Sequence, residues 1–243
     1  MQRPILTQLR MRLLALLLIP LLHTLTSAAS EPAPDKTATA GKSFSDAQRS
    51  AAVSIDHGRR RTEASFKQCI ARAKDDEFRI SLHIWQVENL DVTLPAERVL
   101  ATLPADRRAA LERLLPNDAP NAVPNDALCN LVSTGMRHGD LSYAKTDADA
   151  ARTLRPIYAD DDTLRIAKRN ADLALGCVKQ NYNMGARDFA LMRSGCDCQM
   201  HAIISSASDA EIDEWLAHLD TNPHPPWFAK VLVAARQCTG GSQ

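Results

Sequence analysis

The stretch GCDCQMH, residues 195–201, places two cysteines one residue apart and follows them with a methionine and a histidine. On a helix, residues two apart point about 200° away from one another, so Cys196 and Cys198 face different neighbours. A bond directly between them would be badly strained. We therefore expect this stretch to tie one helix to partners on two sides.

The six cysteines of the chain all follow residue 29. An even number of cysteines in an exported chain predicts three disulfides, formed in an oxidising compartment. We expect Cys196 and Cys198 to bond to Cys177 and Cys238, in an order that the sequence leaves open. The first two cysteines are then left to bond to each other. The expected disulfide cysteines are Cys69, Cys129, Cys177, Cys196, Cys198 and Cys238.

A metal or redox site is the alternative function for the same stretch. Two thiolates together with Met200 and His201 would favour Cu(I) or Zn²⁺. Such a site needs reduced thiols in an oxidising space, and no second Cys or His cluster at ligand spacing accompanies it. We therefore expect no bound metal or cofactor, and keep Cys196, Cys198, Met200 and His201 as the candidate ligands of the alternative.

The N-terminus is arranged like a secretory signal peptide. Arg3, Arg10 and Arg12 precede an apolar run over 13–22, and small residues follow as far as Ala29. This run is well short of the roughly twenty residues that span a bilayer. We expect cleavage near Ala29, delivery to the periplasm or the exterior, and no membrane attachment afterwards. Residues 30–43, which are small, polar and proline-bearing, predict a flexible tail.

Charge and motifs restrict the function further. Removing residues 1–29 leaves 214 residues (243 − 29), enough for one sizeable core or two small ones. The 29 basic residues lose three signal arginines, so 26 basic face 29 acidic residues and the net charge is −3. This charge argues against nucleic-acid binding. The sequence contains neither G-x-S-x-G nor H-E-x-x-H, so we expect no catalytic residues and favour a non-enzymatic role.

Helical spacing of apolar residues dominates the mature chain and predicts a mainly α-helical bundle braced by disulfides. The three tryptophans lie on apolar stripes and are expected in the core. Ser208 and Glu211 fit a capping box at a helix start. The stretch RISLHIWQVENLDVTL, residues 79–94, fits two structures. Its alternating Ile80, Leu82 and Ile84 predict a short β-hairpin, whereas Leu82 and Trp85 also fit a helical phase.

Cysteine spacing suggests an internal repeat. Cys69 and Cys129 are 60 positions apart, and Cys177 and Cys238 are 61 apart, as in two copies of one unit. The proline-rich stretch PNDAPNAVPND, residues 116–126, is typical of a loop between such units. We expect a first helical unit over 44–129 and a second over 130–243, and the sequence leaves open whether they pack as one domain.

Two cysteine-bearing stretches, FKQCIARAKDD (66–76) and LALGCVKQNYN (173–183), resemble the periplasmic amidase-immunity proteins of type VI secretion. That family is small, helical and disulfide-bonded, and the resemblance covers two short helices of a chain about twice the family's length. It implies a role in binding another protein and carries over no inhibitory residues. We therefore expect an exported, non-catalytic protein that binds another protein, with an inhibitor or immunity-like role as its most concrete version.

Overall fold

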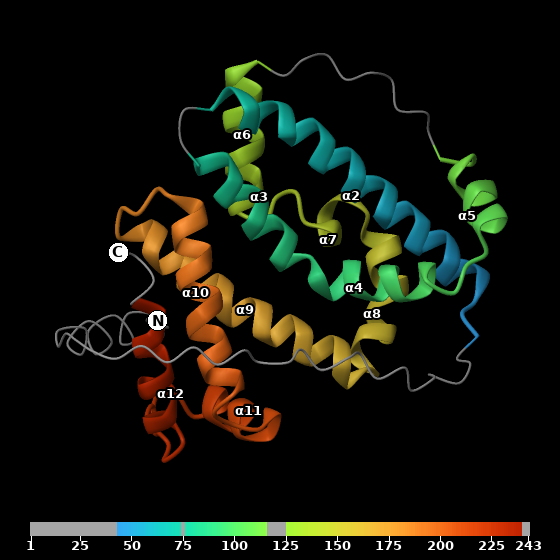
Figure 1. Ribbon diagram of the computed structural model, residues 1–243. Helices are drawn as coiled ribbons and strands as arrows, with labels where there is room; N and C mark the ends of the chain where they lie inside the picture. The colour runs from blue at the N-terminus through green and yellow to red at the C-terminus, as the bar shows by residue number, and fades with distance from the viewer. Residues whose placement is uncertain (1–42, 74–75, 116–124, 240–243) are drawn as a thin grey trace.

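The computed structural model describes residues 43–73, 76–115 and 125–239 (Figure 1). These residues fold into helices without a strand, which confirms the mainly α-helical, disulfide-stabilised class. The elements are α2 (Asp46–Arg72), α3 (Glu77–Glu88), α4 (Leu90–Leu100), α5 (Ala105–Glu112), α6 (Asp126–Arg137), α7 (Tyr143–Thr146), α8 (Ala148–Ala159), α9 (Asp162–Asn183), α10 (Phe189–Ile204), α11 (Asp209–Ala217), α12 (Phe228–Ala235) and the 3-10 turn η2 (Arg236–Thr239).

Several sequence predictions lie outside the described residues. They are the signal segment over 1–29, the tail as far as residue 42 and most of the loop over 116–126. Among the helices that the structure describes, none is long and apolar enough to cross a membrane.

Helices α2, α4 and α8 pack against one another and enclose the largest apolar core. Helix α2 begins at a capping box, in which the Gln48 N–H donates to Ser45 Oγ (3.2 Å) and the Ser45 N–H donates to Gln48 Oε1 (2.9 Å). These bonds satisfy backbone donors that a helix start leaves free. The buried members of the core include Ala52, Ile55, Phe66, Trp85, Val99, Met136 and Leu154.

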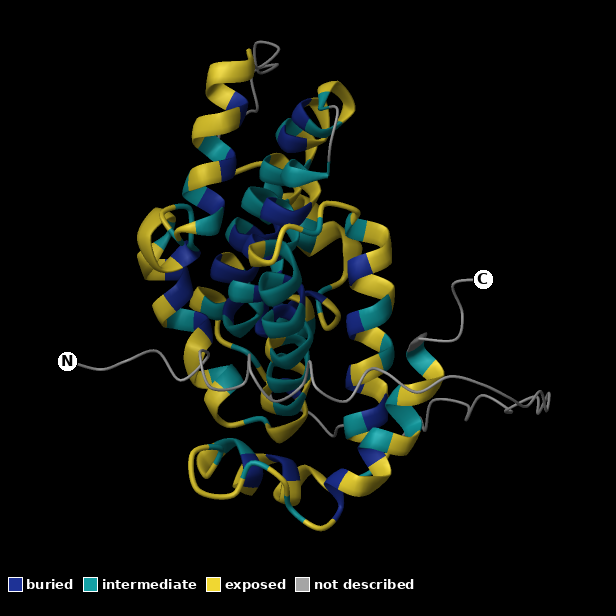
Figure 2. Cartoon of the chain, turned by 90° about the vertical axis from the view of Figure 1, so that its left-hand side faces the viewer, coloured by how far each residue is buried: buried dark blue, intermediate teal, exposed yellow. Residues whose placement is uncertain are grey.

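Helix α9 connects this core to the C-terminal helices. In Figure 1, α2 to α8 occupy the upper right, α10 to α12 gather at the lower left, and α9 runs between them. A second cluster joins α3, α9 and α10 through Ile84, Leu175 and Met192. A third joins α10, α11 and α12 through Trp215 and Val231 among others. Figure 2 shows the buried residues turned toward these contacts and the exposed residues outward.

The β-hairpin expected over 79–94 is wrong, because these residues form α3 and the first half of α4. Ile80 and Ile84 face α9 and α10, while Ser81 and Trp85 are buried on a different side of the helix. A helix that is covered on two sides carries apolar residues on both of them. Along the sequence these residues can alternate with polar ones, as they do in a β-strand. The competing helical phase is the one that the structure adopts.

A buried asparagine joins α3 to α4. The Asn89 side chain is 3% exposed, so both of its polar atoms need partners. Its Nδ2 donates to the Trp85 carbonyl (2.7 Å), and its Oδ1 accepts from the Tyr143 N–H (2.9 Å). Asn89 therefore connects the α3–α4 junction to the start of α7.

The largest core extends beyond the expected unit boundary at 129/130. Cys129, Met136 and Leu154, from α6 and α8, belong to the same buried cluster as residues of α2 and α4. The second cluster combines Ile80, Ile84 and Val87 of α3 with residues of α9 and α10, and the buried residues of the third lie in α10 to α12 and the turn before α12. Helix α3 therefore takes part in both of the first two cores, and the division of the chain into two units stays a prediction.

Candidate functional site

The stretch GCDCQMH lies on α10 and attaches this helix to its neighbours on two sides. Cys196 bonds to Cys177 of α9, and Cys198 bonds to Cys238 of η2, each with a Cα–Cα distance of 5.6 Å. The remaining pair is Cys69 with Cys129, which joins the end of α2 to α6. The two bonds agree with the expected partners Cys177 and Cys238, and the structure supplies the order that the sequence left open.

The disulfides do not follow the suggested repeat. A copy of the Cys69–Cys129 bond would join Cys177 directly to Cys238, but each of these two bonds to a cysteine of α10 instead. The duplication of one unit stays a prediction from cysteine spacing.

The candidate metal ligands do not converge on one point. The sulfurs of Cys196 and Cys198 are held in disulfides, Met200 is buried and His201 is exposed. Across 43–73, 76–115 and 125–239, no group of three or more His, Cys, Asp and Glu residues could hold a metal ion. A thiolate site on this stretch would first require reduction of both bonds.

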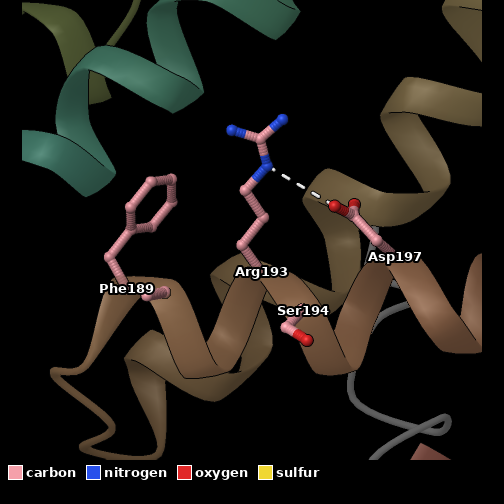
Figure 3. Close-up of a pocket in the computed structure, with 5 residues that line it drawn as sticks. Phe189, Arg193, Ser194 and Asp197 are labelled. Carbon is pink, nitrogen blue, oxygen red and sulfur yellow. Dashed lines mark ion pairs between the residues drawn. The ribbon is translucent and has the colours of Figure 1, made fainter.

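A shallow depression of about 520 Å³ lies along the exposed side of α10 (Figure 3). Phe189, Arg193 and Asp197 stand along this helix, while Ser194 points away from them. Arg193 Nε and Asp197 Oδ2 are 3.4 Å apart, and both side chains are more than half exposed. The two charges compensate each other in water, so this depression offers a ligand little net attraction.

A histidine from α3 contacts Phe189, one of the residues that line this depression. The His83 ring lies 5.3 Å from the Phe189 ring. Burial lowers the pKa of His83, and the positive charge of Arg193 lowers it further, while Asp197 partly opposes this shift. The neutral imidazole is therefore the form that suits the contact between α3 and α10.

An aspartate before α3 accepts a backbone hydrogen bond from the first turn of α10, a helix that Asp188 already caps. Asp76 Oδ2 accepts a hydrogen bond from the Phe189 N–H (2.9 Å). This bond, followed by the bond from the Arg79 guanidinium, lowers the pKa of the Asp76 carboxyl. The contact joins the start of α3 to the start of α10.

We expect Asp76→Ala to lower the free energy of unfolding by about 1 kcal/mol at pH 7, as loss of a side-chain acceptor at a helix start does. Because the folded pKa of Asp76 is lowered, this contribution is present above the unfolded pKa and is lost as pH falls through the folded pKa. Urea unfolding at pH 7 and pH 3 should show a smaller difference between variant and wild type at pH 3. Asp76→Asn is the matched variant, since it keeps an oxygen acceptor without the charge. An equal difference at both pH values would contradict the assignment.

A second and deeper depression, of about 370 Å³, lies between α11 and the turn that leads into α12. We call it the α11 depression and define it by its apolar walls and its acidic edge. The apolar walls are Trp215, Pro225, Pro226 and Trp227, the acidic edge is Glu211 and Glu214, and the remaining lining is polar: His218, Thr221 and Asn222.

Local interactions hold the α11 depression in shape. The predicted capping box is confirmed, since the Ser208 N–H donates to Glu211 Oε2 (2.8 Å) and the Glu211 N–H donates to Ser208 Oγ (3.4 Å). The Trp215 Nε1–H donates to the Pro223 carbonyl (3.1 Å), which fixes the turn over α11. The Trp215 and Trp227 rings meet edge to face, with centroids 5.6 Å apart.

Sequence reasoning placed Trp215 and Trp227 in the core and missed the depression. Both tryptophans are buried, but each also contributes to its wall. A signal was present in the charges. From residue 194 to residue 229 the chain has six acidic residues and no lysine or arginine. Such a one-sided composition predicts that the surface around the two tryptophans is acidic.

A buried carboxylate on α2 forms the densest charge network of the described chain. Asp56 is 5% exposed and lies 2.9 Å from Arg59, 3.2 Å from Arg60 and 2.5 Å from Arg108 of α5. A buried charge is tolerated when it is paired and hydrogen-bonded in this way. Glu112 adds a further carboxylate 2.6 Å from Arg60. The network holds α5 against α2 and leaves little uncompensated charge for a ligand.

The fold and its bonds define a class of protein. It is a helical, disulfide-braced protein, and its three disulfides indicate an oxidising compartment. No family model matches the chain, and neither a curated protein nor a solved structure matches it. The resemblance to amidase-immunity proteins therefore depends on two cysteine-bearing stretches alone.

Proposed function

We propose that this chain is exported, loses residues 1–29 and acts without catalysis by binding another protein, in the manner of an inhibitor or immunity protein. The observation that carries this proposal is the α11 depression, where aromatic walls and an acidic edge meet at the surface. Aromatic side chains with a polar edge are enriched in protein-binding surfaces.

A rigid scaffold supports the surface. Cys198–Cys238 joins α10 to η2, directly after α12, and Cys177–Cys196 joins α10 to α9. Arg169 of α9 adds ion pairs to Asp209 (2.5 Å) and Asp213 (2.9 Å) of α11. A surface fixed before binding loses less conformational freedom on association, which favours affinity.

The export part of the proposal is supported by the N-terminal sequence and by the disulfides. Expression of the full chain with its own leader, followed by intact-mass analysis, should yield a product that begins close to Ser30 and carries no free thiol. A product that keeps residues 1–29, or one with free thiols, would reject export into an oxidising space.

Binding is tested with this exported product. We expect one protein to co-purify at fixed stoichiometry and to form the same complex again when the two purified components are mixed, as light scattering after size exclusion would show. The chain with reduced and alkylated cysteines is the matched control and should form no complex. Failure of the purified components to recombine, or equal binding by the alkylated chain, would overturn the proposal.

A further inference from the structure

The acidic residues around the α11 depression are unequally compensated. Asp209 and Asp213 pair with Arg169, which approaches from α9. Glu211 accepts from Ser208, and this bond holds the pKa of its carboxyl below the usual range. Glu214 takes part in no ion pair of the described chain. Negative charge is therefore left over at the mouth of the depression.

The walls beneath this charge are partly apolar, and the polar side chains of His218, Thr221 and Asn222 complete them. Trp215, Trp227 and the two prolines present hydrocarbon and ring edges at the surface, and the Trp215 indole N–H already donates to the Pro223 carbonyl. The depression therefore combines a short apolar wall with a carboxylate at its opening. Lysine and arginine side chains have the matching form, since they bury an apolar stem and keep a cationic head near the surface.

The surrounding charge favours the same kind of ligand. Of the six acidic residues in 194–229, Arg193 and Arg169 compensate three, and no ion pair within the described residues compensates Glu211, Glu214 or Asp220; the first lysine or arginine after them is Lys230. Lys230 lies close enough to lower the pKa of Glu211, but it forms no ion pair with Glu214 in the part of the chain that the structure describes. An approaching cation is thus attracted to the Glu214 end of the depression.

We infer that the α11 depression binds a lysine or arginine side chain of the protein partner, with the stem against Trp215 and Trp227 and the charged head beside Glu214. This assignment rests on the proposed function, because it names the chemistry of the partner at the same surface. The cation contributes specificity and faster association as well as affinity.

The three tryptophans make the test internally controlled. Trp85 lies in the α2–α4–α8 core and donates its Nε1–H to the Leu141 carbonyl, far along the chain from α11. A ¹⁵N-labelled chain is titrated with acetyl-Gly-Gly-Arg-Gly-Gly-amide while the indole signals are followed by NMR. We expect the Trp215 and Trp227 signals to shift and the Trp85 signal to stay. The same peptide with citrulline in place of arginine should cause no shift.

Two charge-removing variants test whether the Glu214 carboxylate binds the cationic side chain. Glu214→Gln should weaken peptide binding about fivefold, which corresponds to about 1 kcal/mol, the upper end for an exposed ion pair. Asp106→Asn, on the exposed side of α5, changes the net charge equally and should leave binding unchanged. Absence of any shift with the arginine peptide, equal shifts with the citrulline peptide, or equal weakening by both variants would overturn the inference.

The natural partner separates this inference from the proposed function. A partner that binds wild type and Glu214→Gln equally well would reject the cation site while leaving protein binding intact. If Glu214→Gln loses partner binding while Asp106→Asn keeps it, both the cation site and the proposed function are supported. Arginine-peptide binding by a chain that forms no protein complex would reject the proposed function and keep only a cation-binding depression.

Discussion

Replacing Cys69 and Cys129 together by alanine should lower the free energy of unfolding by about 4 kcal/mol, as loss of a bond that closes a long loop does. The two cysteines are 60 residues apart, so the bond removes much conformational freedom from the unfolded chain. Both side chains are 2% exposed, and alanine avoids placing a hydroxyl in the core that they share with Phe66. Urea unfolding followed by circular dichroism measures the change.

The matched variant removes the Cys177–Cys196 bond in the same way. This bond spans only 19 residues, so its removal should cost about 3 kcal/mol, roughly 1 kcal/mol less than removal of the longer loop. Reduction of all three bonds in the wild type should lower the free energy of unfolding by more than either variant does. If the short-loop variant proved the less stable of the two, unfolded-chain entropy would not be the source of the stabilisation.

The helical bundle, and the attachment of α10 to two different neighbours, could be predicted because local geometry determines them, whereas the choice of partner cysteines could not. Two cysteines separated by one residue on a helix must face different neighbours, and α10 does bond to α9 on one side and η2 on the other. The Ser208–Glu211 capping box could be predicted for the same reason, since its donors and acceptors lie within one helical turn.

The misassigned and missed features depend on packing between distant segments. Helix α3 is covered on one side by α9 and α10, and Ser81 on another side meets Ser133 of α6 at 2.7 Å. Asp56 finds Arg108, a partner 52 residues away, on a separate helix. The α11 depression exists because the turn before α12 folds back over α11. Periodicity in one segment contains no information about such contacts.

Trp85 is the largest of the fully buried side chains in the described chain, so its removal should show the cost of a cavity. Trp85 is 2% exposed and packs against Tyr143, with ring centroids 5.6 Å apart. Its Nε1–H donates to the Leu141 carbonyl (2.8 Å), which joins α3 to the segment before α7. Trp85→Ala removes the ring and the hydrogen bond together, so we expect it to lower the free energy of unfolding by about 4 kcal/mol.

Two matched variants separate the causes of this loss. Trp85→Phe keeps an aromatic ring and removes the donor, so it should cost less, about 2 kcal/mol, because the Leu141 carbonyl loses its partner. Trp227→Ala removes an equally large side chain, but from the wall of an open depression that can admit water, so its cost should also be smaller. Unfolding is followed by circular dichroism, since tryptophan fluorescence changes with the substitutions themselves. A larger loss for Trp227→Ala than for Trp85→Ala would mean that the stability of the chain resides in the C-terminal helices rather than in the α2–α4–α8 core.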